Sequence, residues 1–211
     1  LIISGPVPKG DDQQFHILKP RVQQLVEVQK QVVNRSLQEA RKLIAEGHDD
    51  AANGGLHLFR AYRGLPKNSA LIKFLSEPGI KVKMQKTENY YLSEQQKHMP
   101  EVDEELYFNI DEKNNQVDLT EKGLQFITKG GEDPNFFVLP DLSISLSEIE
   151  KSNASPEEKL QQKEHVLQEY SQKADRIHTV QQLLKSYTLF EKDVEYVVLD
   201  GQVKIVDEQT G

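Results

Sequence analysis

Apolar residues recur at three- and four-residue steps in two long stretches of the chain, the spacing of one helical face. The first stretch covers residues 19–46 and carries its apolar side chains at Val22, Leu25, Val26, Val32, Val33, Leu37, Ala40, Leu43 and Ile44. We predict a single helix there, about 40 Å long. Pro20 suits its first turn, where a missing N–H removes no hydrogen bond, and Gly47 suits its end.

The second long stretch covers residues 156–190 and predicts a helix of about 50 Å. It opens on Ser155-Pro156-Glu157-Glu158, a capping box with proline at the first helical position. Its apolar positions are Leu160, Leu167, Tyr170, Ala174, Ile177, Leu184 and Tyr187. We interpret both stripes as helix–helix packing within the domain, and a groove left open for a partner is the alternative.

Shorter patterns fill the rest of the chain. Helices are predicted at 56–63, at 69–76 after Asn68 or Ser69, weakly over 80–98, and near 141–151. Alternating residues predict a hairpin of 106–110 with 116–119 around the turn 112–115, followed by a short helix capped by Thr120. A second hairpin, 196–199 with 203–206, surrounds Asp200-Gly201. These elements indicate an α+β fold that is mainly α.

Charge and composition remove several classes of function. Lys and Arg total 26 against 34 Asp and Glu, a net charge of −8, so the field of the protein disfavours non-specific binding of nucleic acid or anionic lipid. The absence of Cys excludes disulfides, thiolate zinc sites and a Cys nucleophile. No apolar run approaches the ~20 residues of a membrane span.

Candidate catalytic and metal-binding groups lack the required spacing. His48, Asp49 and Asp50 are consecutive, and consecutive side chains do not converge on one ion. His165 and His178 lie thirteen residues apart on one predicted helix, too far to share a metal. The glycines form no phosphate-binding loop, and Asp207 and Glu208 would alternate to opposite faces of a strand. We expect no catalytic residue, metal ligand or cofactor-binding residue in this chain.

Three segments of the chain resemble segments of one known protein family. The strongest is DVEYVVLDGQVKIVDEQTG at 193–211, preceded by LLKSYTLFEKD at 183–193. NIDEKNNQVDLTEKG at 109–123 resembles the hairpin and helix of that family's preprotein cross-linking domain, and LIISGP at 1–6 resembles the strand that leaves the motor. The family is the SecA family of bacterial preprotein translocase motors, and the three segments occur in its order.

The resemblance implies that residues 1–211 form the preprotein cross-linking domain, cut from a longer protein. Stalk strands are expected at 1–5 and 193–211, and a hairpin plus helical core at 106–190. Shorter family members have a few dozen residues between the first and second motifs, whereas about a hundred separate them here, so residues ~15–100 are expected to be partly an insertion. The stalk is expected to be a two-stranded antiparallel pair, Leu1 to Ile3 with part of 203–208.

The resemblance further implies one jaw of a clamp that encloses an unfolded preprotein while the longer protein hydrolyses ATP with Mg²⁺. Its implied partners are unfolded preproteins, signal peptides, the membrane channel complex SecYEG and the other domains of the motor. The implied location is the cytoplasm, with the full-length protein peripherally associated with the inner face of the bacterial membrane. No cofactor is expected in this chain.

Six apolar residues are candidates for contact with preprotein or signal peptide: Ile2, Ile3, Ile177, Leu184, Val203 and Ile205. The alternative is that they are ordinary core, which the continuous stripe favours for Leu184. The rival function is a stand-alone helical adaptor or scaffold that binds a folded protein through the 19–46 helix. A hydrolase is a third and unsupported interpretation.

Overall fold

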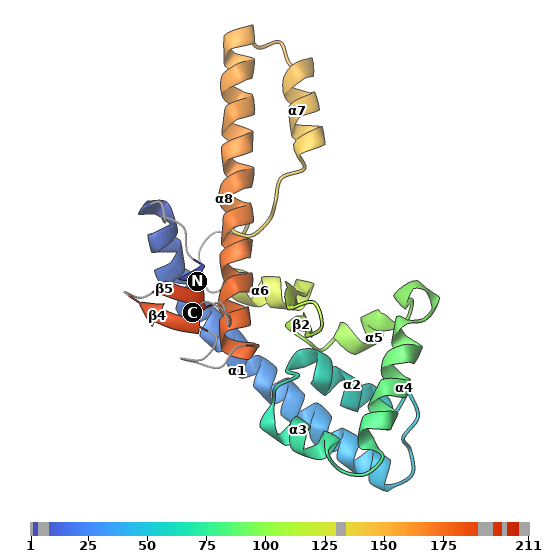
Figure 1. Cartoon of the computed structure of the whole chain (residues 1–211). Coiled ribbons are helices and arrows are strands. Elements are labelled where there is room, and N and C mark those ends of the chain that lie inside the picture. Colours follow the sequence, from blue (N-terminus) through green and yellow to red (C-terminus); the bar gives the residue numbers. More distant parts are fainter. Residues whose placement is uncertain (1, 4–8, 130–133, 190–195, 200–201, 207–211) are drawn as a thin grey trace.

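The protein is described here by a computed structural model (Figure 1), which covers residues 2–3, 9–129, 134–189, 196–199 and 202–206. At 2–3, 9–14, 196–199 and 202–206 it describes the backbone alone. In chain order the elements are β1 (Ile2–Ile3), α1 (Lys9–Ala45), α2 (Gly54–Gly64), α3 (Ser69–Leu75), α4 (Ile80–Leu92), the 3-10 helix η1 (Glu94–Gln96), α5 (Met99–Asp103), β2 (Phe108–Asp111), β3 (Gln116–Leu119), α6 (Glu121–Lys129), α7 (Leu142–Lys151), α8 (Pro156–Thr188), β4 (Tyr196–Leu199) and β5 (Gln202–Val206).

The first long helix begins earlier than the sequence predicts. α1 starts at Lys9, so Pro20 lies inside the helix and the prediction that it occupies the first turn is wrong. The reason is the apolar stripe, which continues upstream: Leu18 is fully buried and Phe15 packs against the core. Burial of Leu18 and Phe15 in this extension offsets the hydrogen bond that proline cannot donate.

Most of the other predicted elements are confirmed, together with their caps. Asn68 Oδ1 accepts the Leu71 N–H at 3.1 Å to open α3, and Ser155 Oγ accepts the Glu158 N–H at 3.2 Å to open α8. Thr120 Oγ1 accepts the Gly123 N–H at 3.2 Å before α6. β2 and β3 pair antiparallel from Phe108↔Leu119 to Asp111↔Gln116, as the alternating pattern predicts.

The weak helix predicted at 80–98 is interrupted. α4 ends at Leu92, and the next residues, Glu94 to Gln96, have φ between 51° and 61°. This left-handed turn brings Met99 and Val102 of α5 back onto Phe59 and Tyr91, with which they form a second, smaller buried cluster. The apolar residues of that cluster therefore decide where the helix breaks.

The first and last strands meet in one sheet of order β1-β5-β4. β1 pairs antiparallel with β5 through Ile2↔Val206 and Ile3↔Ile205, which confirms the predicted pairing. The sheet has three strands rather than two, because β4 pairs with the other side of β5. Leu1, residues 207–208 and the turn Asp200-Gly201 lie outside the described residues.

A single main core joins the early and late parts of the chain. It combines residues of α1 and α2 with Phe108, Ile110 and Val117 of the hairpin and Leu183 and Leu184 of α8. Buried Gln29 crosses this junction: its Nε2 donates to Phe108 O at 2.6 Å and to Gly64 O at 3.2 Å, and its Oε1 accepts the Tyr107 N–H at 2.9 Å. Residues of the expected insertion thus share one core with the hairpin and α8.

The two ends of α8 differ in their surroundings (Figure 1). Residues 173–188, which we call the foot, pack against α1 and the hairpin. Residues 156–170 run alongside α7 and form with it what we call the arm, and Glu169 at its lower end shares a hollow with the segment 135–140. No residue of α7 is buried, and Leu160 and Leu167 are 59% and 48% exposed. The prediction that the whole apolar stripe of the second long helix packs within the domain is therefore wrong for its first half.

Candidate functional site

The site suggested by the sequence centres on the β1-β5-β4 sheet at the foot of α8. β5 contacts α8, and Figure 1 places β4 and β5 beside the lower part of that helix. Four of the six candidate residues belong to this sheet: Ile2 and Ile3 to β1, and Val203 and Ile205 to β5. Ile3 pairs with Ile205 and Val203 with Val198, so the backbone brings the four positions together.

The two candidates on α8 take different positions. Leu184 is fully buried in the main core, so a ligand has no access to it. Ile177 is partly buried and packs against that core. The structure therefore gives Leu184 the core role that its place in the stripe favours, and leaves Ile177 at the margin.

β4 forms an edge of the sheet with a defined pattern of backbone groups. Its register with β5 runs from Tyr196↔Ile205 to Leu199↔Gln202, with two residues of the chain between the last pair. In a two-residue hairpin the closing pair is hydrogen-bonded and bonded pairs alternate with non-bonded ones. The N–H and C=O of Val198 therefore point away from β5, toward the edge on which no other described strand pairs with β4.

A hollow of about 370 Å³ lies between the β2–β3 hairpin and helices α2 and α4, and the sequence did not indicate it. Phe59 and Tyr62 line it together with the carboxylates Glu88, Asp111, Glu112 and Asp118. Arg63 and Lys113 also line it, but Arg63 binds Asp103 at 2.6 and 3.1 Å and Lys113 binds Glu88 at 3.4 Å. Three of the carboxylates belong to the β2–β3 hairpin, whereas Glu88 comes from α4 and the two aromatic residues from α2, so no local motif indicates the hollow.

The residues around this hollow change the pKa of the Tyr62 phenol. Burial raises the pKa of Tyr62, and the carboxylates of Glu112, Glu88 and Asp111 raise it further because they disfavour a second negative charge nearby. The phenol is therefore neutral over the physiological range. The hollow presents aromatic surface beside carboxylates, without a nucleophile next to a general base.

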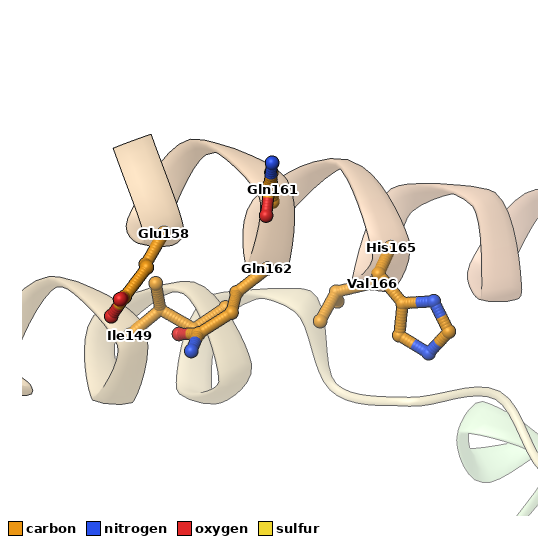
Figure 2. Close-up of a pocket in the computed structure, with 6 residues that line it drawn as sticks. All are labelled: Ile149, Glu158, Gln161, Gln162, His165 and Val166. Carbon is orange, nitrogen blue, oxygen red and sulfur yellow. The ribbon is translucent and has the colours of Figure 1, made fainter. Parts of the chain in front are cut away.

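A second hollow of about 470 Å³ lies in the arm, between α7 and α8. Figure 2 shows Ile149 of α7 and Val166 of α8 between the two helices, while Gln161 points away from α7. Glu158, Gln162 and His165 complete the lining. Glu158, Gln162 and His165 lie within seven residues of one helix, and none of them has a buried polar atom without a hydrogen-bond partner. The lining therefore forms a surface groove and not a set of catalytic residues.

The consecutive acidic residues after the first long helix have structural partners. Asp49 binds Lys83, whose ammonium holds the pKa of this carboxyl below its ordinary value. Asp50 accepts two contacts from the Asn53 amide, at 2.9 and 3.0 Å. Within the residues that the structure describes, no group of three or more His, Asp or Glu is placed to hold a metal ion. In the same residues no helix is long and apolar enough to cross a membrane.

Comparison with known proteins links the geometry to a family. A family model described as the SecA preprotein cross-linking domain matches residues 85–211, which include the β2–β3 hairpin, the arm, the foot and the strands β4 and β5. Proteins named protein translocase subunit SecA are similar over the whole chain: 57% identical in Christiangramia forsetii, 59% in Cytophaga hutchinsonii and 57% in Bacteroides thetaiotaomicron. The chain spans 19% of the length of each of these relatives. No solved structure matches the chain.

Proposed function

Since the chain belongs to the SecA preprotein cross-linking domain family, we propose that it is the part of a protein translocase that contacts unfolded preprotein. The observation that carries this proposal is the family match over residues 85–211, which includes the whole foot of α8 and the hairpin β4–β5. The relatives' shared name, protein translocase subunit, supports it.

The β1-β5-β4 sheet would act as the stalk of a clamp. β1 and β5 are neighbours and antiparallel, so a longer polypeptide would enter and leave this domain through one narrow sheet. A connection through two adjacent strands resists stretching but allows the domain to swing, which suits a jaw that closes on a chain. We keep the proposed domain division, with stalk strands in 1–5 and 193–211, residues ~15–100 partly an insertion and the core in 106–190, and the pairing of β1 with β5 supports its stalk.

The open edge of β4 offers a way to hold clients of unrelated sequence. An extended peptide that pairs with a strand edge forms main-chain hydrogen bonds, which do not depend on its side chains. Tyr196–Leu199 supplies such an edge. Val203 and Ile205 lie on the adjacent strand β5, and Ile2 and Ile3 lie on β1, on the far side of β5. We keep these four residues and Ile177 as candidates for contact with preprotein or signal peptide.

The rest of the activity would belong to other parts of the longer protein. Hydrolysis of ATP with Mg²⁺, contact with the SecYEG channel and peripheral association with the inner face of the membrane are proposed for the full-length translocase. The domain itself would bind no nucleotide, since its glycines form no phosphate-binding loop. Isothermal titration of the chain with ATP and Mg²⁺ tests this, and saturable binding would contradict it.

The proposal is tested by the affinity of the chain for a fluorescent signal-sequence peptide, measured by anisotropy. Val198→Pro removes the N–H that points to the open edge while leaving the bonds of β4 to β5, and Val198→Ala keeps that N–H as the matched control. We expect the proline variant to weaken binding about tenfold and the alanine variant to have little effect. Equal affinities of the wild-type chain and a folded Val198→Pro variant would overturn the edge as the binding element.

The adaptor alternative is weakened by the way α1 is used. Its apolar face is buried against α2, α6 and α8, with Val22, Leu25 and Val33 fully inaccessible. A helix whose apolar face lies in the core has no such face left for a folded partner.

A further inference from the structure

The arm of α8 carries an apolar stripe that the described part of the domain does not cover. Leu160, Glu164 and Leu167 lie at positions i, i+4 and i+7 and so share one face of the helix. The leucines are 59% and 48% exposed. A single exposed leucine is ordinary, but two leucines about two turns apart on one face form a surface on which another helix can pack.

α7 lies beside α8 but does not cover this stripe. Lys159 Nζ donates to Glu150 O at 2.9 Å, and Lys163 forms an ion pair with the Glu150 carboxylate. These contacts hold α7 on the side of Lys159 and Lys163, and in this position it still leaves Leu160 59% and Leu167 48% exposed. Two helices alone enclose no core, which agrees with the lack of any buried residue in α7.

The charge in the stripe restricts what can pack there. Glu164 lies between the two leucines, and no other described residue forms an ion pair with it. A second copy of α8, packed antiparallel about this point, would set two Glu164 carboxylates against each other, which is unfavourable. A helix with a Lys or Arg between two apolar residues would match both the leucines and the carboxylate.

We propose that this stripe is the docking site of such a helix, supplied by the part of the polypeptide that lies outside residues 1–211 in the full-length relatives. That part amounts to about four-fifths of their length. β5 contacts α8 and lies beside its lower part (Figure 1), and β1 pairs with β5, so a longer chain would continue next to the helix that carries the stripe. The docked helix completes a three-helix bundle with α7 and α8.

The test compares amide hydrogen exchange of residues 156–170 in the isolated chain and in the full-length protein. We expect exchange in the arm to be at least about tenfold slower in the full-length protein. Leu160→Gln with Leu167→Gln should remove that protection, and Glu164→Lys should reduce it. Glu148→Lys, at an exposed position of α7, and Leu92→Gln, at an exposed leucine of α4, are the matched controls and should leave it unchanged.

A photo-cross-linking amino acid at Leu167 of the full-length protein identifies the occupant. The proposal expects a cross-link within the same polypeptide, to a helix that carries a Lys or Arg between apolar residues. Equal exchange in the two proteins, a cross-link between two copies, or a cross-link formed only with an added unfolded secretory protein would each overturn it. The last result would mean that the arm binds preprotein. Binding at the edge of β4 is tested separately, by the peptide assay with Val198→Pro.

Discussion

The two halves of α8 belong to one helix with one apolar periodicity, yet their environments are opposite. In the foot, Val180, Leu183 and Leu184 are almost inaccessible and join the core formed with α1 and the hairpin. In the arm, Leu160 and Leu167 are about half exposed beside α7, none of whose residues is buried. Periodicity therefore determines the helix, whereas burial depends on which neighbours reach each turn. The foot therefore contributes to the stability of the domain, whereas the arm exposes apolar side chains on its surface.

The largest expected difference is in the unfolding free energy lost when a leucine of the foot or a leucine of the arm is replaced by alanine. Leu184→Ala should lower the free energy of unfolding by about 2–5 kcal/mol, because it removes methyl groups from a filled core and leaves a cavity. Leu160→Ala, the matched change in the arm, should change it by less than about 0.5 kcal/mol. Urea unfolding followed by circular dichroism measures both, and similar losses would mean that the arm is packed as tightly as the foot.

A second expected effect concerns the polar group that joins the early helices to the hairpin. Gln29→Leu fills the same space but leaves the Tyr107 N–H and the Phe108 C=O without their partner. Unpaired buried groups should lower the unfolding free energy by about 1–3 kcal/mol. Gln23→Leu, at an exposed position of the same helix, is the control and should have little effect. An unchanged urea midpoint for Gln29→Leu would mean that water or another group forms hydrogen bonds with the Tyr107 N–H and the Phe108 C=O.

Removal of a helix cap should lower global stability in the core region but only local stability in the arm. Asn68→Ala removes the cap of α3, whose Leu71 and Phe74 are core residues, and should lower global stability by about 1 kcal/mol. Ser155→Ala removes the equivalent bond at the start of α8, in the arm, and should cause fraying there with little global effect. Hydrogen exchange resolved by residue distinguishes the two. A global loss from Ser155→Ala would contradict the separation of arm from core.

The smallest expected effect is the contribution of His57, in α2, to the pH dependence of the unfolding free energy. Burial lowers the pKa of His57, and the nearby Arg60 guanidinium lowers it further. The unfolded chain therefore binds a proton at this site more readily than the folded one, so stability should be constant above about pH 6.5 and fall as the pH drops below it. His57→Gln should flatten this part of the profile of unfolding free energy against pH. An unaltered slope would assign the effect to other groups.

The sequence predicts elements well where a local signal exists and poorly where a distant neighbour decides. The caps at Asn68, Thr120 and Ser155 and the strands of both hairpins follow from short motifs. The true start of α1 depends on burial of Leu18, which overrides the preference of Pro20 for a first turn. The break after α4 depends on contacts between α5 and α2, which no local pattern records.

The candidate site shows the same division. The pairing of β1 with β5 is predictable because two apolar strands at opposite ends of the chain need partners, and the structure confirms it. The hollow between the hairpin and α2 is not predictable, because its aromatic and acidic residues come from three separate segments. The exposure of Leu160 and Leu167 is likewise invisible in a stripe that continues unchanged into the foot.

One experiment tests directly whether the sheet, and not the arm, meets the client. A photo-cross-linking amino acid is placed at Val198 on the edge of β4 or, in a second protein, at Leu160 on the arm, in the full-length translocase holding a stalled preprotein. The account predicts that the preprotein cross-links to position 198 and that position 160 cross-links within the translocase. Cross-links of the preprotein to position 160 with none to position 198 would contradict it.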